Sequence, residues 1–128
     1  MEKQRVHKLG DLQLKIMRIL WQSREATVSE VHETLSGEKD LAHTTIATML
    51  RKMEQRGLVR HRTEGRTFIY EPSVEEDTVT RKMADDLVER LFAGSLTDAV
   101  SHLISNREIS RTELARLEKL IKERKAES

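Results

Sequence analysis

The sequence predicts a mainly α-helical chain with one small β-hairpin, and three observations lead to this fold class. Apolar residues recur at helical spacing in three segments between residues 9 and 56. A short segment that favours strands around a Glu64-Gly65 turn comes next. Beyond Pro72, the only proline, the apolar residues follow helical spacing again.

The first two predicted helices are short and amphipathic. The first covers residues 9 to 22, where apolar residues three, four and seven apart form one wide stripe. The second begins after Thr27, because Thr27 and Glu30 have the S/T-x-x-E spacing of a capping box. Gly37 is placed to end this second helix.

The third predicted helix covers about residues 43 to 56. It ends at Gly57, since glycine suits the left-handed position that follows many helices. We expect the apolar faces of all three helices to meet in one core. Trp21 and Phe68 are the expected largest members of that core.

A hairpin of about residues 59 to 70 follows the third helix. Thr67 to Tyr70 favour a strand, and Glu64-Gly65 supplies a turn. Three helices followed by a two-stranded hairpin is the order of elements in a winged helix-turn-helix. We therefore expect residues 1–72 to form a winged-helix domain.

Residues 73–128 are predicted to form a helical dimerisation domain. Gly94-Ser95 separates its first two helices, and a capping box of Ser110 and Glu113 opens the third. A stretch of this length with one aromatic residue can hardly bury a core alone, so we expect burial against a second copy. The expected dimer contacts are the apolar residues Met83, Leu87, Leu91, Phe92, Val100, Leu103, Leu114, Leu117, Leu120 and Ile121.

The composition excludes several function classes. The chain has no Cys, so disulfides, thiolate metal sites and cysteine nucleophiles are excluded. No apolar run approaches the roughly 18 to 20 residues of a membrane span, and the start MEKQRVHKLGDL lacks the apolar core of a signal peptide. We therefore expect a cytoplasmic protein.

Catalysis and metal binding are not expected either. The sequence has no Gly-rich phosphate loop and no nucleophile elbow, so we expect no enzymatic activity. Its five histidines, at positions 7, 32, 43, 61 and 102, include no pair at helical i,i+3 or i,i+4 spacing. We expect no designed metal site and no cofactor.

The charge is unevenly distributed along the chain. Residues 1–70 hold 13 Lys or Arg against 9 Asp or Glu, and residues 71–128 hold 10 against 13. The densest basic stretch is residues 39–66, with seven Lys or Arg against three acids. This asymmetry places any attraction for polyanions in the first part of the chain, although an ordinary solvated surface is equally compatible with it.

The third predicted helix is the candidate recognition helix for duplex DNA. Small Thr side chains at its start allow it to enter a major groove about 12 Å wide. Guanidinium groups of the hairpin match phosphate oxygens in shape and charge. The candidate DNA-binding residues are His43, Thr44, Thr45, Thr48, Arg51, Lys52, Arg60, Arg62 and Arg66. A solvated helix and a solubilising edge hairpin are the alternatives.

The order and spacing of four segments resemble those of a known family. The segments are LGDLQLKIMRILW, TVSEVHETL, LAHTTIATMLRKMEQRGLV and RTFIYEP. The family is the penicillinase repressor family, the BlaI/MecI/CopY group of bacterial winged-helix repressors. The resemblance covers nearly the whole chain and is specific over residues 9 to 72. It implies a homodimer with interlocked C-terminal helices on a palindromic operator. It also implies that Thr44, Thr45, Thr48 and Arg51 meet the operator and that Arg62 and Arg66 lie on the wing.

Two regulatory features of the family are missing. Copper-responsive members end in a cysteine cluster, and this chain ends KLIKERKAES, so we expect no copper sensing. Members controlled by a membrane sensor-protease are cut at an Asn-Phe bond, whereas the matching stretch AVSHLISNRE has His102-Leu103 near that place. A regulatory protease is therefore a candidate partner, but this chain lacks the Asn-Phe pair at the matching place.

The sequence thus predicts a repressor that binds double-stranded operator DNA as a homodimer. The alternative is a winged helix used as a protein-interaction module, whose basic face meets an acidic partner. A third interpretation is a metal- or ligand-gated sensor of another winged-helix family.

Overall fold

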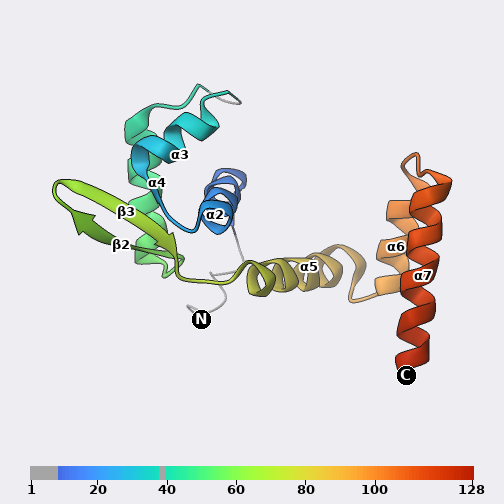
Figure 1. Cartoon of the computed structure of the whole chain (residues 1–128). Helices are drawn as coiled ribbons and strands as arrows, with labels where there is room; N and C mark the ends of the chain where they lie inside the picture. The colour runs from blue at the N-terminus through green and yellow to red at the C-terminus, as the bar shows by residue number, and fades with distance from the viewer. Residues whose placement is uncertain (1–8, 38–39) are drawn as a thin grey trace. The chain divides into compact units, whose positions relative to one another are not determined.

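The computed structural model describes residues 9–37 and 40–128 (Figure 1). The chain divides into two compact units, Met1–Asp85 and Asp86–Ser128, and the boundary lies within helix α5 (Glu76–Phe92). No helix in the described ranges is long and apolar enough to cross a membrane.

The first unit contains the three predicted helices: α2 (Asp11–Ser23), α3 (Val28–Leu35) and α4 (His43–Gln55). The predicted capping box at the start of α3 is confirmed. Thr27 Oγ1 accepts a hydrogen bond from the Glu30 backbone N–H at 3.1 Å, and Glu30 Oε1 accepts one from the Thr27 N–H at 2.8 Å. Two otherwise unpaired backbone donors are satisfied in this way, which explains why α3 begins where the sequence predicts.

Helix α4 ends as predicted at Gly57, which adopts a φ of 80°. The Gly57 N–H donates to the Glu54 carbonyl and the Leu58 N–H donates to the Met53 carbonyl, both at 3.0 Å. This pair of bonds is the Schellman motif, which requires a left-handed residue after the helix. The turn sends the chain directly from α4 into the hairpin.

The hairpin consists of β2 (Val59–Glu64) and β3 (Thr67–Pro72), with Gly65 at a φ of 63° in the turn. A positive φ at the first of two turn residues is the requirement of a type II′ turn. A two-residue strand that the sequence did not predict, β1 (Ala26–Thr27), pairs antiparallel with β3. The sheet order is β1-β3-β2, so the predicted hairpin is extended to three strands.

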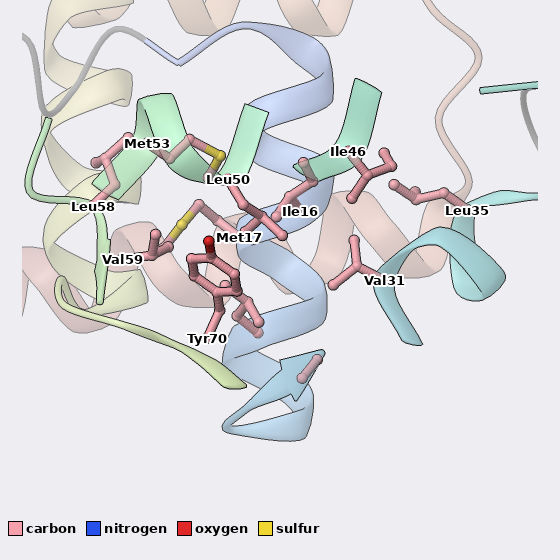
Figure 2. Packing of buried hydrophobic residues seen from close by; sticks show 12 residues of the cluster. Ile16, Met17, Val31, Leu35, Ile46, Leu50, Met53, Leu58, Val59 and Tyr70 are labelled. Atoms are coloured by element: carbon pink, nitrogen blue, oxygen red, sulfur yellow. The ribbon is translucent and has the colours of Figure 1, made fainter. Parts of the chain in front are cut away.

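One apolar core joins the three helices to the base of the hairpin, and Figure 2 shows most of its members from close by. Its buried residues are Ile16, Met17, Leu20, Ala26, Val31, Leu35, Ile46, Leu50, Met53, Leu58, Val59 and Tyr70. The order of elements and this shared core are those of the predicted winged helix-turn-helix.

The prediction that Phe68 is a large core residue is wrong, because Phe68 is 45% exposed and Tyr70 is buried at 4%. Side chains alternate along a strand, so Phe68 and Tyr70 share one face of β3. Phe68 lies two residues nearer the hairpin tip, beyond the edge of the core. Trp21 is half-buried against the core, and its indole N–H donates to the Val74 carbonyl at 2.9 Å.

Two of the predicted signals also mark boundaries among the remaining helices. After α5, Gly94 has a φ of 84°, and Ser95 Oγ accepts a hydrogen bond from the Asp98 N–H at the start of α6 (Leu96–Ser105). Ser110 caps α7 (Arg111–Glu127) by accepting from the Glu113 N–H at 3.1 Å. Helices α6 and α7 lie side by side as a helical hairpin (Figure 1).

Candidate nucleic-acid interface

Helix α4 presents a polar ridge on the face opposite the core. Its buried residues, Ile46, Leu50 and Met53, define the inward direction. Because residues of an α-helix follow one another at about 100°, the opposite side is occupied by positions 44, 48, 51 and 55. All four side chains are exposed, and we call them the α4 ridge: Thr44, Thr48, Arg51 and Gln55. The ridge is free of bulky apolar groups, so it can enter a groove.

The N-terminus of α4 has no side-chain cap, because its N-cap residue is Ala42. The first backbone N–H groups of a helix carry partial positive charge and favour anions such as phosphate. His43, the first residue of α4, lies with its Nε2 at 3.2 Å from Ser29 Oγ, which connects the starts of α3 and α4. The start of α4 therefore suits a phosphate contact.

A groove of about 580 Å³ runs between α4, the start of α3 and strand β3. Three basic side chains line it: His43 and Arg51 from α4, and Arg66 from the hairpin turn. Ala47 and the exposed ring of Phe68 contribute apolar surface to the same groove. The sequence predicts Phe68 in the core and gives no sign that its ring lines this groove.

The hairpin is attached to α4 through His61. Its Nδ1 lies 2.8 Å from both carboxylate oxygens of Glu54 in α4, and its ring stacks on Phe68 at 4.1 Å with an interplanar angle of 18°. Burial raises the pKa of the neighbouring Tyr70 hydroxyl, and the negative charge of Glu54 raises it further. These contacts hold the inner face of the hairpin against the helix that carries the ridge.

The outer face of the hairpin carries a network of ion pairs. Arg60 Nε lies 2.6 Å from Glu71 Oε1, across the β2–β3 ladder. Arg62 forms a two-pronged contact with Glu25, at 2.9 and 3.1 Å, and also binds Glu64 at 3.0 Å. Hydrogen bonds from Arg62 hold the pKa of the Glu25 carboxyl below its usual value, so this carboxylate stays charged at neutral pH.

The predicted DNA-binding residues thus separate into three groups. His43, Arg51 and Arg66 line one groove, and Thr44 and Thr48 lie beside it on the α4 ridge. Thr45 and Lys52 are exposed on the side of α4 away from the groove. The guanidinium groups of Arg60 and Arg62 are engaged by carboxylates.

Gln55 completes the ridge four residues after Arg51, and helical spacing from Arg51 could have identified it as a contact residue. His7 and Lys39, which entered the histidine and charge counts, lie outside the described residues. Within residues 9–37 and 40–128, no three His, Asp or Glu side chains are grouped to hold a metal ion.

The second unit exposes most of its apolar side chains. Within residues 86–128, Ala99 is the single buried residue. Of the predicted dimer contacts, Met83, Phe92 and Leu117 are half-buried and the others are exposed; Leu96 and Ile104, which the prediction omitted, are exposed as well. The groove between α6 and α7 has a volume of about 620 Å³ and is lined by Val100, Leu103, Ile104 and Leu117. This unit has a large apolar surface and very little core.

Comparison with known proteins identifies the family. A family model described as penicillinase repressor matches residues 9–123. The penicillinase repressor of Bacillus licheniformis is 26% identical over 121 residues, which cover 94% of each chain. Transcriptional regulator BlaI of Mycobacterium tuberculosis is 35% identical over 99 residues, 76% of this chain and 72% of that protein.

The solved structures agree with this result. The solution structure of the DNA-binding domain of the repressor BlaI matches 56% of this chain and 87% of that domain, at 31% identity and a TM-score of 0.51. Both the fold class and the family expected from the sequence are confirmed. The chain therefore belongs to the penicillinase repressor family of winged-helix transcriptional repressors.

Proposed function

We propose that this DNA-binding transcriptional repressor binds a palindromic operator as a homodimer. Residues 1–72 bind DNA, with α4 in the major groove and the β2–β3 hairpin as a wing on the DNA backbone. Residues 73–128 dimerise. The observation that carries the proposal is the α4 ridge, a row of exposed polar side chains opposite the core and beside a groove that contains Arg51 and Arg66.

The dimensions and chemistry of α4 suit the major groove. An α-helix with its side chains is about 10–12 Å across, and the major groove of B-DNA is about 12 Å wide. Thr44 and Thr48 offer hydroxyl groups to base edges or phosphates and methyl groups to thymine. Arg51 can donate two hydrogen bonds to the O6 and N7 of a guanine, which gives it the largest expected share of sequence discrimination.

The groove beside the ridge suits the sugar-phosphate backbone. Arg66 and the uncapped N-terminus of α4 both attract phosphate, and neither makes sequence-specific contacts when it binds the backbone. Each phosphate neutralised by a cationic side chain releases condensed counterions, so binding should weaken steeply with salt. The groove thus sets the position of the domain on DNA, and the ridge supplies the sequence preference.

Dimerisation is proposed from the composition of the second unit. Nine apolar side chains that belong to it or to the end of α5 are 37% to 70% exposed: Leu87, Leu91, Leu96, Val100, Leu103, Ile104, Leu114, Leu120 and Ile121. A second copy of the chain would cover this surface with the same surface, as a two-fold interface requires. Two linked recognition helices would then meet half-sites about 34 Å apart.

The proposal assigns the protein to the bacterial cytoplasm, where the operator is accessible. It does not include a regulatory protease. The residues His102 and Leu103 are exposed in α6, but they do not form the Asn-Phe pair at which protease-controlled relatives are expected to be cut.

The test is a selection of bound duplexes from a random-sequence DNA library, with the full chain at near-physiological salt. We expect an inverted repeat whose half-site centres are about 10 to 10.5 base pairs, or a multiple, apart. Arg51→Ala should lose much of the consensus. Arg81→Ala, which removes an exposed arginine of α5 paired with Asp77, should retain it.

The alternative outcomes separate the parts of the proposal. A single half-site without symmetry would reject the homodimer and retain DNA binding. Recovery of no consensus, with only salt-sensitive attraction to any duplex, would reject sequence-specific repression. A protein-interaction module with an acidic partner would then be the better interpretation.

A further inference from the structure

The two faces of the wing differ in chemistry. Across the sheet, Ala26, Tyr70 and His61 stand opposite one another, and so do Thr27, Ile69 and Arg62. Residues paired in this way point to the same face, and successive residues point to opposite faces. Ala26, Tyr70 and His61 lie on the face toward α4, because Tyr70 belongs to the core. Arg62 therefore lies on the outer face, away from the recognition helix.

The outer face holds more acidic than basic groups. Two arginines, Arg60 and Arg62, lie within 4.0 Å of three carboxylates, those of Glu25, Glu64 and Glu71. The cluster has a net charge of −1 when all five groups are ionised. A phosphate of the DNA backbone would gain little from a surface whose cations are already neutralised.

The groove face contrasts with the outer face. Arg51 and Arg66 line the groove, and within the described part of the chain neither has a carboxylate at ion-pair distance. Their donors are available to phosphates or bases. The sequence predicts DNA contact for all three arginines of the hairpin, since nothing in a linear sequence shows which carboxylates reach them.

The contacts of Arg62 use both edges of its guanidinium group. Nη1 and Nη2 bind the two oxygens of Glu25 at 2.9 and 3.1 Å, and Nε binds Glu64 at 3.0 Å. A two-pronged arginine–carboxylate contact defines an orientation as well as a distance. Glu25 lies in the connection between α2 and β1, thirty-seven positions from Arg62 in sequence, so the contact links the hairpin to a separate part of the domain.

We propose that Arg62 is a wing-positioning residue and not a phosphate contact. Its two-pronged contact with Glu25 sets the angle of the hairpin, so that Arg66 at the turn meets the DNA backbone. This inference rests on the proposed function and deepens it. Two of the hairpin cations then have different roles: Arg66 contacts DNA, and Arg62 orients the hairpin. Glu25, which no sequence motif marks, becomes a contributor to operator affinity.

Loss of the contact between Arg62 and Glu25 should have a small effect on operator affinity. Arg62 and Glu25 have side chains that are 45% and 46% exposed, and exposed ion pairs are weak. We expect Arg62→Gln and Glu25→Gln each to weaken operator binding by about two- to fivefold, with little change in stability. A phosphate contact would behave differently, because its loss also makes the dependence of affinity on salt less steep.

The experiment measures the affinity of the full chain for its selected operator over a series of salt concentrations. The logarithm of the binding constant falls linearly with the logarithm of salt, with a slope of about −0.9 per phosphate contact. Arg66→Gln should make the slope less steep by about 0.9. Arg62→Gln and Glu25→Gln should lower the affinity at every salt concentration and leave the slope unchanged.

A double variant and a remote control complete the set. Glu25→Gln combined with Arg62→Gln should bind no more weakly than Arg62→Gln alone, because both substitutions remove the same contact. Arg81→Gln removes an exposed, ion-paired arginine from α5 and should change neither affinity nor slope. Circular dichroism and thermal melting confirm that each variant is folded.

Three results would overturn the inference. The first is a slope less steep by about 0.9 for Arg62→Gln, which would make Arg62 a phosphate contact. The second is a gain of affinity for Glu25→Gln, which would mean that Glu25 competes with phosphate for Arg62. The third is a double variant whose loss of affinity equals the sum of the two single losses, which would mean that Glu25 and Arg62 act independently. A wild-type chain without operator binding would instead reject the proposed function itself.

Discussion

The proposed dimer can be tested through Leu120, an apolar residue of α7 that is 62% exposed. We replace it by aspartate. Leu117, three residues earlier on the same helix, is unsuitable because it lines the groove between α6 and α7, where a substitution would also disturb the helical hairpin. Leu120 does not line that groove, so its replacement acts chiefly on the proposed dimer contact at the outer surface of α7.

The free energy of dimerisation that Leu120→Asp removes can be worked from the exposed fraction of the Leu120 side chain. Complete burial of a leucine side chain contributes about 1.5–3 kcal/mol, so covering the exposed three-fifths of Leu120 contributes about 1–2 kcal/mol per copy. A two-fold dimer contains the residue twice, which gives about 2–4 kcal/mol in total. At about 1.4 kcal/mol per factor of ten, Leu120→Asp should raise the dimer dissociation constant roughly 30- to 700-fold.

Sedimentation velocity over a series of protein concentrations measures this change, and operator titrations at the same concentrations report its effect on DNA binding. Ala115→Asp is the matched control. Ala115 is exposed, belongs to the same helix and lies on a different face, since it is five residues before Leu120. We expect it to dimerise like the wild type. Equal dissociation constants for Leu120→Asp and the wild type would refute the assignment of α7 to the interface.

Three further predictions concern the DNA-binding unit. Arg51→Ala should weaken operator binding by about 1–3 kcal/mol while the dimer persists, because it removes a base contact of the ridge; fluorescence anisotropy measures this, and unchanged affinity would remove Arg51 from the interface. Gly57→Ala should lower the free energy of unfolding by about 1–2 kcal/mol, since the φ of 80° is costly for any residue with a Cβ and the surrounding space is open. Urea unfolding compares it with Gly37→Ala, which is equally open but not left-handed, and equal losses would contradict the backbone argument. Burial raises the folded-state pKa of Tyr70 above its usual value, so the contribution of Tyr70 to stability is present below the usual pKa and is lost as pH rises through the folded-state pKa. Tyr70→Phe should show a smaller loss at high pH than the wild type, and because Tyr70 is the only tyrosine, its ultraviolet absorbance reports the ionisation directly.

Several parts of the fold could be predicted because they depend on residues close together in the chain. The capping box of Thr27 and Glu30, the left-handed Gly57 and the cap at Ser110 each form within one helical turn. Hydrophobic periodicity identified the inward faces of the helices for the same reason. The exposed ridge of α4 follows from that periodicity, since the positions that do not face the core must face outward.

Other features depended on residues brought together from distant positions. Strand β1 has two residues, too few for a period-two pattern, and it exists because Ala26 pairs with Tyr70. The burial of Tyr70 and the exposure of Phe68 follow from where the core ends along β3, which alternation within the strand does not indicate.

The sequence alone therefore determined the helices, the hairpin, the family resemblance and the candidate recognition helix, because local backbone hydrogen bonds and apolar spacing specify them. Only the tertiary structure separated the hairpin arginines. Arg66 lines the groove beside Arg51, whereas Arg62 is held by Glu25 from the connection before β1. The physical reason is that an ion pair depends on distance in space, and the sheet brings these two side chains within 2.9 Å although they are far apart in sequence.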